Sequence, residues 1–72
     1  MLVMNYKNTN SAVIKQWFCT LKKTDLINEA QKLKLLIIAT PVDDCDLNYR
    51  NKLLDILRFA RVAYIHRFLQ RR

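Results

Sequence analysis

The chain has 72 residues, 51% of them hydrophobic, and a net charge of +7. This length allows one domain at most, and the apolar content excludes a disordered basic tail. The chain has no glycine, which argues against an all-β fold and a P-loop, because hairpin turns and phosphate-binding loops need that residue.

The first half of the chain is expected to be helical. Residues 1–9 are interpreted as a short, weakly ordered lead, and helical periodicity begins near Ser11. We expect one long helix over about residues 11–39, with a kink near Lys23; the alternative is two helices, with Thr24-Asp25 as the N-cap of the second. The apolar residues that share one face at helical spacing are Ile14, Trp17, Phe18, Leu21, Leu26, Ala30, Leu33 and Ile37.

Pro41 ends this helix, because proline lacks an N–H donor and disfavours helical backbone at the preceding residue. A loop over residues 40–45 follows. Its aspartates, with Asp46, place negative charge at the start of the next helix, where the helix dipole favours it. The second helix is expected over about residues 46–70. Two long helices joined by a short loop predict an all-α fold built on an antiparallel helical hairpin.

The second helix has two faces at helical spacing. One is apolar and is expected to pack against the first helix; it consists of Tyr49, Leu53, Ile56, Leu57, Ala60, Ala63, Tyr64 and Phe68. The other face, called the arginine stripe below, consists of Arg50, Leu54, Arg58, Arg61, Ile65 and Arg72. Phe59 is the one aromatic residue of this helix off the apolar face, which leaves it as a candidate for base stacking.

Charge is concentrated in this second helix. Residues 47–72 hold six Arg, one Lys and one acid, a net charge of +6, against +1 for residues 1–46. No acid interrupts the arginine stripe, and the planar guanidinium suits phosphate oxygens better than an ammonium does. The stripe therefore predicts a surface for a polyanion.

Outward-facing apolar residues predict a second subunit. Leu54, Val62, Ile65 and Leu69 leave more apolar surface on the second helix than a lone hairpin can bury. We therefore expect a homodimer.

No pattern of catalytic or metal-binding residues is present. His66 is the only histidine, and Cys19 and Cys45 lack metal-ligand spacing. We expect no enzymatic activity, no metal or other cofactor and no small-molecule substrate. The longest apolar run, residues 35–39, is too short to span a membrane, and the chain begins without a secretory signal. These features predict a cytoplasmic protein with reduced thiols.

The segment LLIIATPVDDCDLNYR resembles the helix–loop–helix joint of the small RNA-silencing suppressors of nodaviruses. In the matching pattern an apolar helix end runs into Ala39-Thr40-Pro41, and after four residues Asp46-Leu47 opens a long second helix. The similarity in layout covers roughly residues 11–69.

The resemblance implies a fold and a function. Members of that family are antiparallel dimers of helical hairpins that form a four-helix bundle along one face of double-stranded RNA. They shield long duplexes from dicing and bind small interfering duplexes. Carried onto this chain, the resemblance makes Arg50, Leu54, Arg58 and Arg61 the duplex-facing residues. The chain departs from the family about two turns later, where Tyr64 or Ile65 replaces a basic residue and Arg67 is nearby. The residues expected to bind RNA are Arg50, Arg58, Arg61, Arg67 and Arg72.

Elementary chemistry agrees with duplex RNA as the partner, because A-form RNA displays phosphates and 2′-hydroxyls to a surface that recognises shape. The sequence leaves other functions open. The main alternative is a small all-helical regulator that binds a protein partner or DNA. Sequence-specific DNA recognition and membrane-surface binding by the basic helix are further alternatives.

Overall fold

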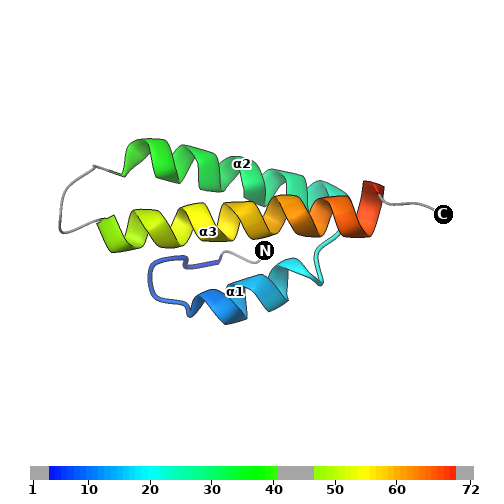
Figure 1. The fold of residues 1–72 in the computed structure, drawn as a ribbon, viewed down its shortest axis with the longest axis horizontal. Coiled ribbons are helices and arrows are strands. Elements are labelled where there is room, and N and C mark those ends of the chain that lie inside the picture. The colour runs from blue at the N-terminus through cyan, green and yellow to red at the C-terminus, as the bar shows by residue number, and fades with distance from the viewer. Residues whose placement is uncertain (1–3, 41–46, 70–72) are drawn as a thin grey trace.

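A computed structural model of the chain describes residues 4–40 and 47–69 (Figure 1). These residues form an all-helical fold, which confirms the predicted all-α class. None of the described helices is both long and apolar enough to cross a membrane. The elements in chain order are α1 (Ser11–Phe18), α2 (Lys23–Ala39), α3 (Leu47–Tyr64) and the π-helix η1 (Ile65–Leu69), which continues α3.

Helices α2 and α3 lie side by side and run antiparallel (Figure 1). The Lys23 ammonium, at the start of α2, lies 5.9 Å from the ring centre of Tyr64, at the end of α3. The apolar face predicted for the second helix is confirmed, since Tyr49, Tyr64 and Phe68 pack against a core to which α3 contributes Leu53, Ile56, Leu57, Ala60 and Ala63. Helix α2 buries Leu26, Leu33 and Ile37 against it.

The first half of the chain differs from the single helix expected over residues 11–39. It forms two helices, α1 and α2, and residues 19–22 separate them. The break precedes the Thr24-Asp25 cap that was the alternative, and Lys22 takes the N-cap position without a side-chain hydrogen bond. Locally, the Thr20 hydroxyl donates to the Trp17 carbonyl at 2.7 Å, which offers the backbone an alternative to continued helix.

The break has a tertiary cause. Helix α1 folds back and runs parallel to α3, as two contacts show: Lys15 pairs with Asp55, and Phe18 accepts a hydrogen bond from Arg67. A straight helix would carry residues 11–22 past the end of α3 and leave its apolar face in water. Folding back leaves Ile14 and Phe18 0% exposed, and burying each such side chain contributes roughly 1.5–3 kcal/mol.

The N-terminal segment corrects the expectation of a weakly ordered lead over residues 1–9, of which residues 1–3 lie outside the described part. Tyr6 is only 5% exposed and belongs to the core. Its hydroxyl donates to the buried Glu29 carboxylate, and its ring meets the Phe18 ring edge-on at 6.3 Å. Asn10 then caps α1 by accepting a hydrogen bond from the Ala12 N–H at 2.8 Å.

The expected loop and helix starts fall partly outside the described residues. Helix α2 ends at Ala39, and the Thr40 N–H and hydroxyl both donate to the Leu36 carbonyl. Residues 41–46, which include Pro41 and most of the joint that carries the family resemblance, are not described. The expected basic helix of residues 46–70 corresponds to α3 and η1 together, which cover residues 47–69.

Candidate polyanion-binding face

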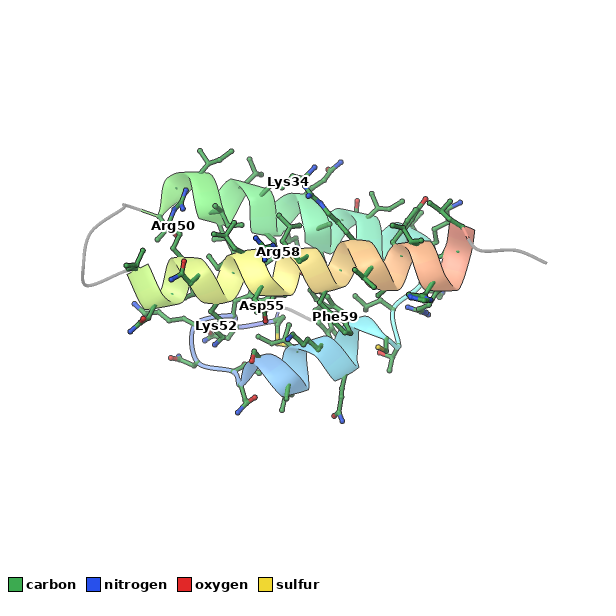
Figure 2. All side chains as sticks on the ribbon, in the orientation of Figure 1. Lys34, Arg50, Lys52, Asp55, Arg58 and Phe59 are labelled. Atoms are coloured by element: carbon green, nitrogen blue, oxygen red, sulfur yellow. The ribbon has the colours of Figure 1, made fainter. Side chains whose placement is uncertain are left out.

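The centre of the arginine stripe is exposed on the side of α3 that adjoins α2. Arg58 and Arg61 are both exposed. In Figure 2, Arg50 and Arg58 lie along the α2 side of α3, whereas Lys52, Asp55 and Phe59 lie toward α1. The arginine stripe and the side of α3 that carries Lys52, Asp55 and Phe59 therefore have different neighbours. Arg58 and Arg61 face solvent beside α2, and the residues a half-turn away are engaged with α1.

Arg50 is less accessible than the other arginines of the stripe. Its side chain is half-buried, and its Nε atom is buried without a hydrogen-bond partner among residues 4–40 and 47–69. It lies near the start of α3, close to the undescribed joint. Of the residues predicted to contact a polyanion, Arg58 and Arg61 are therefore the best presented.

Arg67 has a structural contact that the sequence did not indicate. One of its Nη atoms donates to the Phe18 carbonyl at 3.0 Å, and its guanidinium lies 4.7 Å from the Phe68 ring centre. The Phe18 carbonyl also accepts from the Leu21 N–H, so Arg67 adds a second donor at the end of α1. Although exposed, Arg67 is directed to α1 and not to the face that carries Arg58. Arg72 lies outside the described residues.

Helix α2 adds cations to the same face. A groove of about 340 Å³ runs between α2 and α3, and Lys34 and Arg61 line it from opposite helices. Lys23 and Lys34 are exposed on α2, and Lys23 lies over Tyr64. We call the set Lys23, Lys34, Arg50, Arg58 and Arg61 the two-helix basic face.

The sequence pattern did not assign Lys23 and Lys34 to this face, because the periodicity of a helix does not indicate which neighbouring helix packs against each of its sides. A signal was nevertheless present in the sequence. The residues Lys23, Ile27, Gln31, Lys34 and Ile38 follow steps of four, four, three and four. The arginine stripe has the same steps from Arg50 to Ile65.

Carboxylates are segregated from the two-helix basic face. The described acids are Asp25, Glu29 and Asp55, and none of them lines the groove between α2 and α3. Asp55 pairs with Lys15 of α1 at 2.8 Å. Glu29 is buried and accepts from Tyr6 and from Lys32, and Asp25 shares with Lys32 a hollow on the α1 side of α2.

Among residues 4–40 and 47–69, this segregation leaves the basic face without a neutralising carboxylate. The ion pairs among the described residues are Lys15–Asp55 and Lys32–Glu29, so Lys34, Arg58 and Arg61 pair with no described carboxylate. Like charges gathered on one side of a small protein create a positive potential that attracts anions. The face is therefore suited to a ligand that presents several negative charges in a row.

Phe59 does not belong to this face. It is half-buried and packs against the core, and the Lys15 ammonium lies 5.7 Å from its ring centre. Helix α1 therefore covers the residue that the sequence left as a candidate for base stacking. The role proposed for Phe59 is corrected to packing between α1 and α3.

The described residues offer no alternative metal chemistry, since among them no three His, Cys, Asp or Glu side chains are grouped to hold an ion. No known protein family, curated protein or solved structure matches the chain.

Proposed function

We propose that the protein binds double-stranded RNA without regard to sequence and, as a homodimer, suppresses RNA silencing by shielding duplexes from dicing and loading. The observation that carries the proposal is the two-helix basic face, on which exposed Arg58 and Arg61 meet no described carboxylate. Guanidinium groups spaced along one side of a rigid helix favour repeated phosphates over a single small anion.

The geometry favours recognition of shape over recognition of bases. Helix α3 has 18 residues, a length of about 27 Å, too long and too regularly charged for the short base-contacting helix of sequence-specific DNA readers. A-form RNA hides its base edges in a deep, narrow groove and displays phosphates and 2′-hydroxyls across a shallow one. The resemblance of the joint to nodavirus suppressors supports the silencing role.

Exposed apolar residues at the end of α3 and in η1 support the homodimer. Val62, Ile65 and Leu69 are 51%, 45% and 55% exposed. Leu54, expected with them, is half-buried and packs against the core. Ile65 lines the groove between α2 and α3, so a second copy that covers Val62 and Leu69 would remove their apolar surface from water.

The first experiment is a gel-shift comparison of double-stranded RNA, single-stranded RNA and a DNA duplex of the same sequence. We expect clear preference for the RNA duplex. Equal binding to the DNA duplex would contradict recognition of A-form shape. Absence of binding to all three would favour the alternative, a helical regulator of a protein partner.

The Arg58→Ala and Arg61→Ala variants test the site. Each should weaken RNA-duplex binding about equally for unrelated sequences and should lower the magnitude of the salt slope by about one. Lys15→Ala, on the α1 side, is the matched control and should leave the slope unchanged. The double variant should also lose the ability to protect a long duplex in an in vitro dicing reaction. Unchanged affinity in a folded double variant would remove this face from the site.

A further inference from the structure

We infer that the RNA backbone binds in a two-walled channel, the groove between α2 and α3. Lys34 of α2 contacts phosphate there, across the groove from Arg61 of α3. This inference rests on the proposed function and adds a contact that the arginine stripe alone does not contain. It places the RNA backbone in the groove between the two helices of the basic face, where Lys34 and Arg61 line opposite sides.

The first support for this channel is the matching spacing of residues on the two helices. The α2 residues Lys23, Ile27, Gln31, Lys34 and Ile38 repeat the spacing of Arg50, Leu54, Arg58, Arg61 and Ile65. Helices α2 and α3 run antiparallel and lie side by side (Figure 1), so the two series of residues have opposite directions. Ile27, Gln31 and Lys34 line that groove opposite Arg61 and Ile65.

The second support for this channel is the chemistry of the groove between α2 and α3. Its remaining lining is mostly apolar, from Leu26, Ile27, Ala30, Ala60, Tyr64 and Ile65. The acids of the described residues lie elsewhere, and Ile27 and Ile65 stay 36% and 45% exposed. Such a channel, apolar at its base and cationic on both walls, is complementary to a sugar–phosphate strand, whose ribose carbons contact the base while phosphates meet both walls.

Lys32 provides a matched control on the same helix. It is two residues from Lys34 and exposed, but it pairs with Glu29 and lines the hollow on the α1 side. If only net charge mattered, removing either ammonium would weaken RNA binding equally. If RNA binds in the channel, only removal of the Lys34 ammonium should weaken RNA binding.

The experiment measures the affinity of Lys34→Gln and Lys32→Gln for an RNA duplex at several salt concentrations. We expect Lys34→Gln to lower the magnitude of the salt slope by about one, Lys34→Arg to restore it, and Lys32→Gln to leave it unchanged. Circular dichroism and urea denaturation check that each variant is folded, because Lys32→Gln removes a partner of the buried Glu29 carboxylate whereas Lys34 has no described ion pair.

The outcomes separate this inference from the proposed function. Equal effects of Lys34→Gln and Lys32→Gln, while Arg58→Ala still weakens binding, would overturn the two-walled channel and leave the α3 site standing. A wild-type chain that does not bind the RNA duplex would overturn both. Failure of Lys34→Arg to restore the slope would also overturn the phosphate contact, because arginine keeps the charge.

Discussion

At the scale of single residues, the most consequential polar contact is the buried one between Tyr6 and Glu29. Glu29 is 8% exposed, and its carboxylate is satisfied by the Tyr6 hydroxyl and the Lys32 ammonium. A buried carboxylate that loses such a partner bears a desolvation cost that its remaining bonds do not offset. The contact ties the N-terminal segment to α2 across 23 residues of sequence.

Replacing Tyr6 tests this contact. Tyr6→Phe keeps the ring against Phe18 but removes the hydroxyl, and we expect it to lower the free energy of unfolding by about 1.5–3 kcal/mol. Tyr64→Phe is the control, because the Tyr64 hydroxyl makes no hydrogen bond among residues 4–40 and 47–69. Urea denaturation gives both values. Equal effects of the two substitutions would contradict a special role for the Tyr6 hydroxyl.

The same variant has a second readout at high pH. Burial, and then the Glu29 carboxylate beside it, raise the pKa of Tyr6 well above its usual value. The folded protein therefore keeps this proton where the unfolded chain releases it, near pH 10. The stability that the group contributes is complete below about pH 10 and declines as the pH rises further. Wild type should lose stability more steeply than Tyr6→Phe in that range, and parallel declines would contradict the argument.

At the scale of elements, α1 is stabilised by its packing on α3. Ile14 is 0% exposed there, whereas its neighbour Val13 is 51% exposed. We expect Ile14→Ala to lower the free energy of unfolding by about 2–5 kcal/mol. Val13→Ala should change it by no more than about 0.5 kcal/mol. Urea denaturation of the two variants checks this, and a reversed order would mean that α1 does not fold back as described.

The elements also show what sequence patterns determine. Periodicity sufficed for α3, where Leu53 and Ile56 are buried and Arg58 is exposed as predicted. It left one kinked helix or two helices open and did not place the break at residues 19–22, because no glycine or proline marks it and its main cause is the burial of Ile14 and Phe18 by a distant helix. A local sequence pattern is a weak predictor of structure where tertiary contacts decide between two conformations.

The residues of the candidate site were predictable from the sequence only where their exposure depends on a single helix. Arg58 and Arg61 follow from the uninterrupted stripe, since exposure along one helix is a local property. Lys34 joins them only when α2 packs beside α3, and Arg67 is directed to Phe18 only when α1 folds back. Residues 65–69 also adopt π-helical geometry, which shifts their direction relative to an extrapolated α-helix.

At the scale of the whole molecule, the net charge of +7 opposes the association that the exposed apolar residues favour. Two copies repel each other, and salt screens that repulsion, because the Debye length falls from about 10 Å at 0.1 M to about 3 Å at 1 M. Phosphate contacts respond in the opposite direction and weaken as salt rises. A polyanion that neutralises the charge of both copies should therefore strengthen the dimer, as screening by salt does.

Dimerisation and RNA binding should therefore have opposite salt dependences. We expect sedimentation equilibrium to show stronger dimerisation at 1 M than at 0.1 M salt, and an RNA duplex added at 0.1 M salt to promote it. Val62→Asn should weaken the dimer and also weaken RNA binding, although no cation is changed. Val13→Asn is the control, because Val13 and Val62 are both 51% exposed and Val13 lies on α1. A folded monomer at both salt concentrations that binds the duplex tightly would contradict the homodimer, and a dimer weakened by salt would contradict its apolar basis.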